Sequence, residues 1–156
     1  MTEQTNAVPA GDGTADVPLS TGGFIEFLGL RFHEVGPDRV VITWEATPAL
    51  HQPYGIVHGG VYAAVVETAA SFGAAVWLGD RGQVVGVNNQ TDFLRAVRTG
   101  ALRAVGEPIH RGRLQQLWLV EIRDDADRLV ARGQVRLQNV TSADRLGVPP
   151  SVERPG

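Results

Sequence analysis

The sequence contains no cysteine, which excludes disulfides, thiolate metal sites and cysteine nucleophiles. Its four histidines, at positions 33, 51, 58 and 110, show no HxxxH or HxH spacing, so we expect no metal site. We also expect no cofactor. The formal net charge of -3 is too small to indicate a nucleic-acid surface. The N-terminus lacks the charged start and apolar run of a signal peptide. The absence of cysteine fits a cytoplasmic protein, which is the location we expect.

The length of 156 residues suits a single domain. A domain of this size buries about 70% of the surface that its unfolded chain exposes, so it needs no disulfide or metal to hold it together. Residues 1–18 are polar and rich in Gly, Pro, Thr and Ala, and we interpret them as a disordered tail. Residues 142–156 have three prolines and no periodicity, and we interpret them in the same way. The folded domain is therefore expected over residues 19–141.

One stretch, from His51 to Leu78, organises the rest of the chain; it reads HQPYGIVHGGVYAAVVETAASFGAAVWL. Prolines and glycines mark its first part as an irregular loop. The eighteen residues after Gly60 contain no proline and are apolar on every side, which predicts a helix buried nearly all round. The helix is too short and too rich in alanine to indicate a membrane span. Glu67 is its only charged residue, and a buried carboxylate needs a partner, a shifted pKa or a water-lined pocket.

The flanking segments predict a short helix and about six strands. The short helix would be capped by Ser20 or Thr21 and ended by Gly29. The strand candidates are residues 30–35, 39–47, 83–96, 100–111, 114–124 and 129–140. The first two would form a hairpin, and the short links between the others predict consecutive antiparallel hairpins. The expected fold class is α+β, with a curled antiparallel sheet wrapped round one long helix.

The glycines before the long helix can form a site for an oxyanion. The first N–H groups of a helix lack intrahelical partners and lie at the positive end of its dipole, and Gly59 and Gly60 let a ligand approach them. Glu67 lies about 12 Å further along the axis, too far to share a ligand atom with Gly59 of the same chain. In a dimer, an antiparallel partner helix could bring its own Glu67 to the loop. A helix that one sheet leaves partly uncovered also favours a dimer.

These residues resemble a known family. His58-Gly59-Gly60 followed by Glu67 is similar to the HGG…E/D signature of the hotdog-fold acyl-CoA thioesterases, and the phenylacetate-pathway and 4-hydroxybenzoyl-CoA type looks closest. The resemblance covers about residues 20–140. Residues 87–96, VNNQTDFLRA, are similar to the family's N-F-L-R-P-like strand, with Ala96 where proline is common. Residues 129–133, LVARG, are similar to its last strand.

The resemblance implies a role for each of four positions. The Gly59 N–H would polarise the thioester carbonyl, and Gln52 would assist there or position water. Glu67 would act as nucleophile or as general base, and Ser71 would orient water. The resemblance also implies that Gln52 and Gly59 come from one subunit and Glu67 and Ser71 from the other, in agreement with the distance along the helix.

Several further residues are candidates for the site. His58 can be a catalytic base, but we favour a structural role in which its ring fixes the loop by hydrogen bonds. The substrate-binding candidates are Gly60, Asn89, Arg95, His110, Arg111 and Arg113. The basic ones would bind the phosphates of coenzyme A, or those at positions 110–113 would simply form a solvated hairpin end.

The sequence thus predicts an acyl-CoA thioesterase that acts as a homodimer, with a homotetramer as the next level of assembly, and that binds neither nucleic acid nor membrane. Two alternatives remain. A hotdog-fold dehydratase or hydratase would use a histidine on the helix, and this helix has none inside it. A non-catalytic acyl-CoA-binding module would not need the full set of Gln52, Gly59, Glu67 and Ser71.

Overall fold

The computed structural model describes residues 23–141. The predicted tails, and the predicted caps Ser20 and Thr21, lie outside the described residues. The helices are α1 (Phe24–Phe27) and α2 (Gly59–Leu78), and two short 3-10 turns are η1 (Pro48–Leu50) and η2 (Gly79–Arg81). The strands are β1 (Arg31–Val35), β2 (Val40–Glu45), β3 (Gly82–Phe93), β4 (Ala101–Arg111), β5 (Gln115–Asp124) and β6 (Leu129–Thr141).

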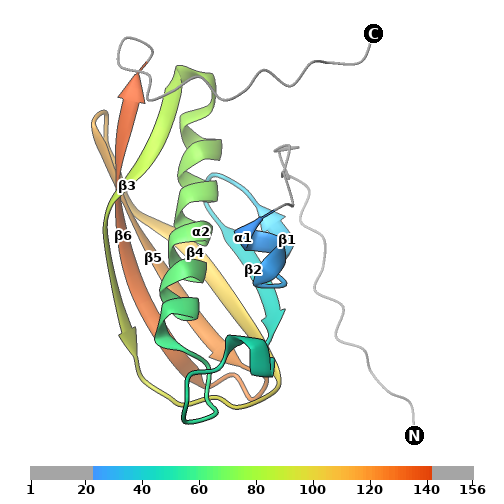
Figure 1. Cartoon of the computed structure of the whole chain (residues 1–156). Coiled ribbons are helices and arrows are strands. Elements are labelled where there is room, and N and C mark those ends of the chain that lie inside the picture. Colours follow the sequence, from blue (N-terminus) through green and yellow to red (C-terminus); the bar gives the residue numbers. More distant parts are fainter. Residues whose placement is uncertain (1–22, 142–156) are drawn as a thin grey trace, which may run out of the picture.

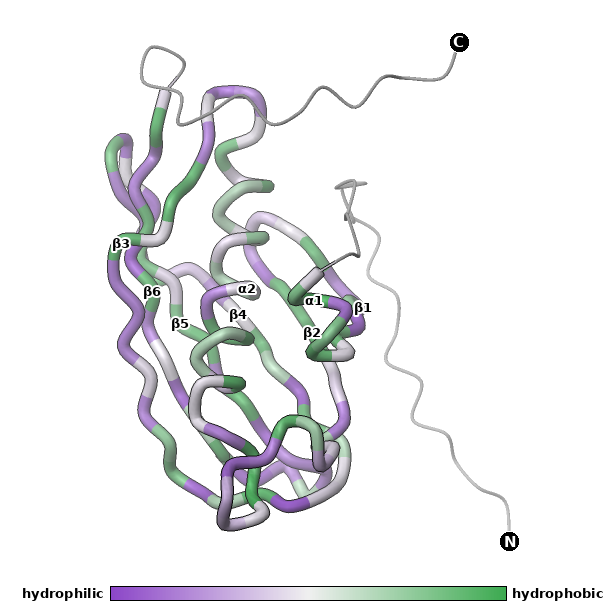
Figure 2. Tube along the Cα trace, in the orientation of Figure 1, coloured by the Kyte–Doolittle hydropathy of each residue, from purple (hydrophilic) through white to green (hydrophobic). Residues whose placement is uncertain are grey.

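The six strands form one antiparallel sheet in the order β1-β2-β4-β5-β6-β3. The sheet curls round α2, which runs along its concave side (Figure 1). Polar and apolar residues alternate along the strands, as expected for a sheet with one face on the core and one in solvent (Figure 2). The predicted α+β class and hotdog architecture are confirmed.

The predicted hairpin between the third and fourth strands is wrong. β3 pairs with β6 along its whole length and forms one edge of the sheet. The connection to β4 instead contacts the loop before α2, where the Val57 N–H donates to the Val97 carbonyl at 2.8 Å. β3 also ends at Phe93, three residues before the predicted end, because the next two N–H groups turn to the Val130 carbonyl.

The core lies between α2 and the concave face of the sheet. On β5 the inward side chains are fully buried, among them Gln116, Trp118 and Ile122. Trp118 reaches the helix at Gly73, where a β-carbon would overlap its ring. The buried residues of α2 share one face: Val61, Tyr62, Val65, Val66, Ala69, Ala70, Gly73, Ala74 and Leu78.

The opposite face of α2 stays partly open, so the predicted burial all round does not hold for the single chain. Ala63, Glu67 and Ser71 are half-buried on this side, and Ala75 is exposed. By length and composition alone, residues 59–81 could cross a membrane, but half of the apolar window is buried in the fold. A helix packed along a sheet in this way is the core helix of a globular domain.

Candidate active site

The N-terminus of α2 offers one free backbone donor. His58 caps the helix in an extended conformation, and its Nδ1 accepts from the Gly60 N–H at 2.8 Å. The Val61 N–H donates to the His58 carbonyl at 2.9 Å. None of the hydrogen bonds within residues 23–141 uses the Gly59 N–H. This donor therefore points from the positive end of the helix without a partner, as an oxyanion site requires.

The same hydrogen bonds define the roles of His58 and Gly60 at the start of the helix. Because Nδ1 of His58 accepts a hydrogen bond, the neutral ring carries its proton on Nε2. The ring fixes the turn into α2, which agrees with the structural role favoured for it. The Gly60 N–H, predicted to touch substrate, is engaged by this cap.

A pocket of about 230 Å³ brings together three predicted site residues from three chain segments. Gln52 comes from the loop before α2, Gly59 from the helix start and Arg95 from the connection after β3. The Gln52 loop is a tight turn, with the Gln52 N–H donating to the Ile56 carbonyl at 2.8 Å. The remaining lining residues are mostly apolar: Ile56, Val57, Tyr62, Phe93, Leu94 and Ala96.

Two aromatic side chains, to which the sequence motifs assign no role, form a wall of this pocket. The Phe93 ring lies directly against Gly59, since a β-carbon there would be 2.7 Å from its Cε2. The ring centroids of Phe93 and Tyr62 are 6.1 Å apart. The Tyr62 hydroxyl is buried without a hydrogen-bond partner among the described residues, and burial raises the pKa of Tyr62 to about 12. Alternation along β3 could have indicated Phe93, but only the fold places it over Gly59.

Glu67 lies two turns further along α2, with its carboxylate between the helix and β3. The Asn89 amide donates from Nδ2 to Glu67 Oε2 and to the Ala63 carbonyl, each at 3.0 Å. The other oxygen, Oε1, lies so close to Gly86 that a β-carbon there would overlap it. The carboxylate thus has the partner that its position demands. Ser71 is half-buried one turn later on the same face, and its hydroxyl makes no hydrogen bond within residues 23–141.

The predicted cluster at 110–113 lies at the other end of the molecule. Arg111 pairs with Asp38 at 2.9 Å, donates to the Pro37 carbonyl at 2.7 Å and lies over the ring of Trp77, near the end of α2. His110 and Arg113 line a separate depression beside the β4–β5 turn. Within one chain, only Arg95 among the basic candidates lies beside Gln52 and Gly59. The described residues contain no group of three or more metal-ligating side chains.

Comparison with known proteins places these features in a wider context. The family model described as the thioesterase superfamily matches residues 54–131. A Mycobacterium tuberculosis protein with a provisional esterase name, Rv1847, is 52% identical over 135 residues, which are 85% of this chain and 96% of that protein. The crystal structure of AziG from S. sahachiroi is 53% identical, with a TM-score of 0.76 over 77% of this chain and 98% of that one. The 1,4-dihydroxy-2-naphthoyl-CoA hydrolase of Escherichia coli is 31% identical over 71% of this chain and 82% of its own length.

Proposed function

Because the chain belongs to the thioesterase superfamily, we propose that it hydrolyses an acyl-CoA thioester to a carboxylic acid and free coenzyme A. The family and the named relatives support thioester hydrolysis in general. The observation that carries the proposal is the unpartnered Gly59 N–H, which lines the same pocket as Gln52 at the positive end of α2. A thioester carbonyl placed there would find a fixed donor for the negative charge that develops on its oxygen.

In the proposed reaction, Glu67 supplies the carboxylate. It either takes a proton from a water molecule that attacks the carbonyl carbon, or attacks that carbon itself to form an anhydride that water then opens. On either route the C–S bond breaks and coenzyme A leaves as the thiol after protonation. The Gly59 N–H acts in the same way on both routes, because both pass through a tetrahedral oxyanion.

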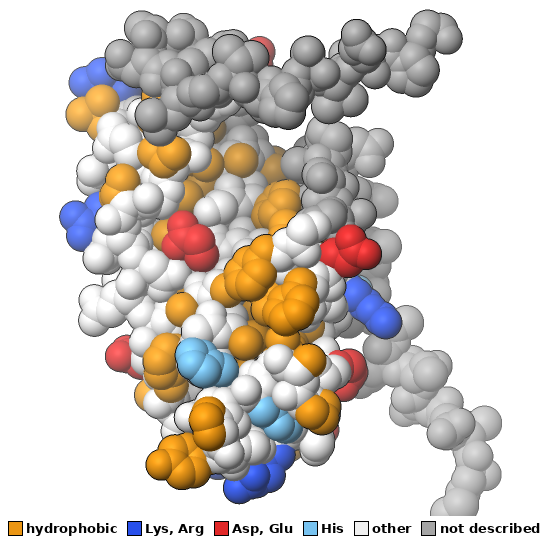
Figure 3. Space-filling model, in the orientation of Figure 1, with side chains coloured by type: hydrophobic (Ala, Val, Ile, Leu, Met, Phe, Trp, Pro, Cys, Tyr) orange, Lys and Arg blue, Asp and Glu red, His pale blue; other side chains and the backbone are white. Residues whose placement is uncertain are grey.

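We further propose that each site is shared between two copies of the chain. Gly59 and Glu67 are about 12 Å apart along one helix, which is too far for both to act on one carbonyl. The free edge of β3 and the open face of α2 offer a surface for a second copy, on which Val87 and Phe93 are more than half exposed. Figure 3 shows hydrophobic side chains gathered over α2 and its flanks, with an acidic side chain among them. An antiparallel copy on this face would bring its Glu67 toward Gly59.

We propose an aromatic acyl group as the substrate to test first. Tyr62 and Phe93 line the pocket beside Gly59, and flat rings pack well against aromatic side chains. The Escherichia coli relative is named for a naphthoyl thioester. The proposal is also consistent with the resemblance to the 4-hydroxybenzoyl-CoA type.

The test is thiol release from a panel of acyl-CoAs that includes 1,4-dihydroxy-2-naphthoyl-CoA, 4-hydroxybenzoyl-CoA and hexanoyl-CoA. The wild type is expected to release thiol, fastest with an aryl substrate. Glu67→Gln should keep the fold and lower kcat by about 10²–10⁴-fold, because the amide is neither a base nor a good nucleophile. Glu107→Gln, which alters an exposed carboxylate on β4, is the matched control and should change nothing.

Each result decides a different point. A folded wild type that binds these acyl-CoAs without releasing thiol would contradict hydrolysis and favour the binding module. Wild-type kcat in Glu67→Gln would make Glu67 a structural residue.

A further inference from the structure

We infer that Asn89 and Thr91 are positioning residues for Glu67, and that a β-bulge at Val87 aims them at the helix. The inference rests on the proposed function, since it concerns the carboxylate that the proposed reaction uses. The sequence indicates Glu67 as the reacting carboxylate and names Asn89 only as a substrate-binding candidate, and it gives Thr91 no role. What holds that carboxylate in place is visible only in the pairing of β3 with β6.

The bulge changes which residues of β3 face α2. Gly86 pairs with Leu137, and Asn89 pairs with Val135, and both partners are fully buried on the concave face. Directly opposed residues in a sheet share a face, so Gly86 and Asn89 both face inward although three positions separate them. Val87, where the register shifts, is the extra residue. Without this extra residue, the alternation of side chains would turn Asn89 to the solvent face. Bulges beside active sites commonly re-aim a side chain in this way.

The hydrogen bonds of Asn89 allow one orientation of its amide. Nδ2 donates to Glu67 Oε2 and to the Ala63 carbonyl, which are both acceptors only. Oδ1 must then accept, and it does so from the Thr91 hydroxyl at 2.7 Å. A reversed amide would turn its oxygen toward a carboxylate and a carbonyl, which is repulsive. The Thr91 hydroxyl therefore locks the amide with its N–H groups toward Glu67.

The sheet leaves room for this arrangement at two glycines. Gly133 on β6 pairs with Thr91 on β3, and a β-carbon on Gly133 would lie 2.6 Å from the Thr91 hydroxyl. Gly86 lies against Oε1 of Glu67, as described above. The carboxylate thus accepts a charge-assisted hydrogen bond at Oε2, and its Oε1 packs against the backbone of Gly86, which has no side chain. A reacting group fixed in this way loses little orientational freedom during the reaction.

The experiment compares variants of β3 by steady-state thiol release. Thr91→Val keeps the shape of the side chain and removes the donor, and Asn89→Ala removes the amide. Both should lower kcat by at least about tenfold and leave KM nearly unchanged, because they act on the geometry of the carboxylate and not on substrate binding. Thr91→Ser restores the hydroxyl and should restore kcat. Asn88→Ala is the matched control, since Asn88 pairs with the exposed Arg136 on the outer face and should behave as wild type.

A pH profile separates positioning from a general loss of packing. Asn89→Asp places a second carboxylate beside Glu67, and like charges disfavour ionisation of both. The acid limb of its pH–kcat profile should therefore move to higher pH than in the wild type, whereas Asn88→Asp should leave it in place.

The inference is overturned if Thr91→Val keeps wild-type kcat, if Thr91→Ser loses as much as Thr91→Val, or if the acid limb of Asn89→Asp does not move. These failures are distinct from failure of the proposed function. If the proposed function were wrong, the wild type itself would release no thiol from any acyl-CoA.

Discussion

At the scale of single residues, the backbone N–H of Gly59 can be removed with little other change. Gly59 is the first residue of α2, the helical position at which proline is best tolerated, and His58 already has the extended backbone that precedes proline. Gly59→Pro should therefore keep the helix and lose the oxyanion donor, with a fall in kcat of about 10²–10³-fold. Gly59→Ala is its matched control, because it adds the same β-carbon against the exposed Phe93 ring but keeps the N–H. Equal kcat values for the two variants would show that this amide does not act on the substrate.

Also at this scale, the buried hydroxyl of Tyr62 gives a prediction about stability. It has no hydrogen-bond partner within residues 23–141, and an unsatisfied buried polar group costs about 1–3 kcal/mol. Tyr62→Phe removes the hydroxyl and keeps the ring against Phe93. The free energy of unfolding in urea at pH 7 should stay the same or rise by up to about 1 kcal/mol. A loss of more than that would mean that the hydroxyl has a partner, for example in a second copy of the chain.

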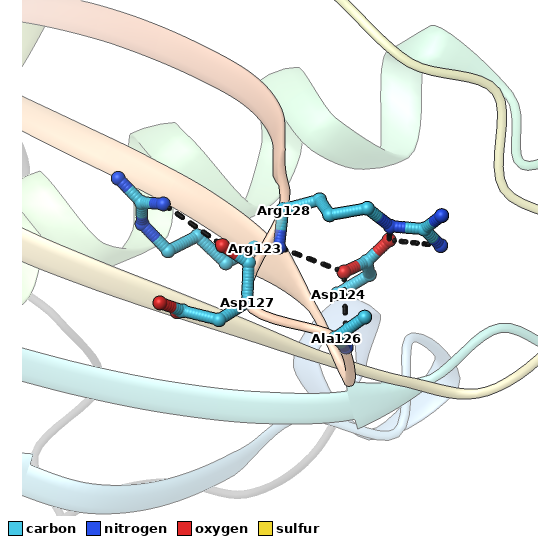
Figure 4. A network of polar contacts seen from close by, with 5 residues as sticks. All are labelled: Arg123, Asp124, Ala126, Asp127 and Arg128. Carbon is cyan, nitrogen blue, oxygen red and sulfur yellow. Dashed lines mark hydrogen bonds and ion pairs between the residues drawn. The ribbon is translucent and has the colours of Figure 1, made fainter.

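At the scale of elements, the β5–β6 turn is held by one carboxylate. Asp124 accepts from the backbone N–H groups of Ala126 and Arg128 at 3.1 and 2.9 Å, and from the Arg128 side chain at 2.8 Å (Figure 4). The hydrogen bond from the Arg128 side chain is the largest cause that lowers the pKa of Asp124 from its ordinary value. A carboxyl with a lowered pKa in the folded state stabilises the fold above its unfolded-state pKa, and this contribution is lost as the pH falls below about 4.

Asp124→Asn should therefore be less stable than wild type at pH 7 and should lose less stability between pH 6 and pH 3. The measurement is the free energy of unfolding in urea across this range, with Asp80→Asn on the exposed η2 turn as the control. An unchanged slope with pH in Asp124→Asn would show that the turn does not contribute to acid lability.

The sequence largely predicts where the helix and strands begin and end, but it does not predict which strands pair with each other. Apolar periodicity and turn residues placed α2 and the six strands to within a few residues, because these signals are local. The position of β3 at the sheet edge depends on which distant strand it pairs with, and the short connection to β4 wrongly suggested a hairpin. The same limit applies to the site: the motif indicated Gly59 and Glu67, but Thr91 is recognised only once the bulge at Val87 sets which side of β3 faces inward. A glycine inside a strand, such as Gly86, was the one local signal for that bulge.

At the scale of the whole molecule, we expect an oligomer. The open face of α2 and the unpaired edge of β3 lie side by side, and Val87 and Phe93 on that edge are more than half exposed. Burial of such a surface against a second copy would complete both the core and the site. Sedimentation equilibrium at micromolar concentration should give at least twice the 16.7 kDa of the chain. A single species at the monomer mass would contradict both the interface and the shared site.

The most direct measurement of the central claim is complementation between two inactive variants, Gly59→Pro and Glu67→Gln, refolded together in equal amounts. In a two-fold dimer with shared sites, a mixed dimer collects both lesions in one site and leaves the other intact. Random mixing makes about half the dimers mixed, each with one good site of two, so thiol release should return to about a quarter of the wild-type rate. If Gly59 and Glu67 acted within one chain, every site would carry a lesion. Activity that stays at the level of the single variants, with subunit exchange confirmed by mass spectrometry, would contradict the account.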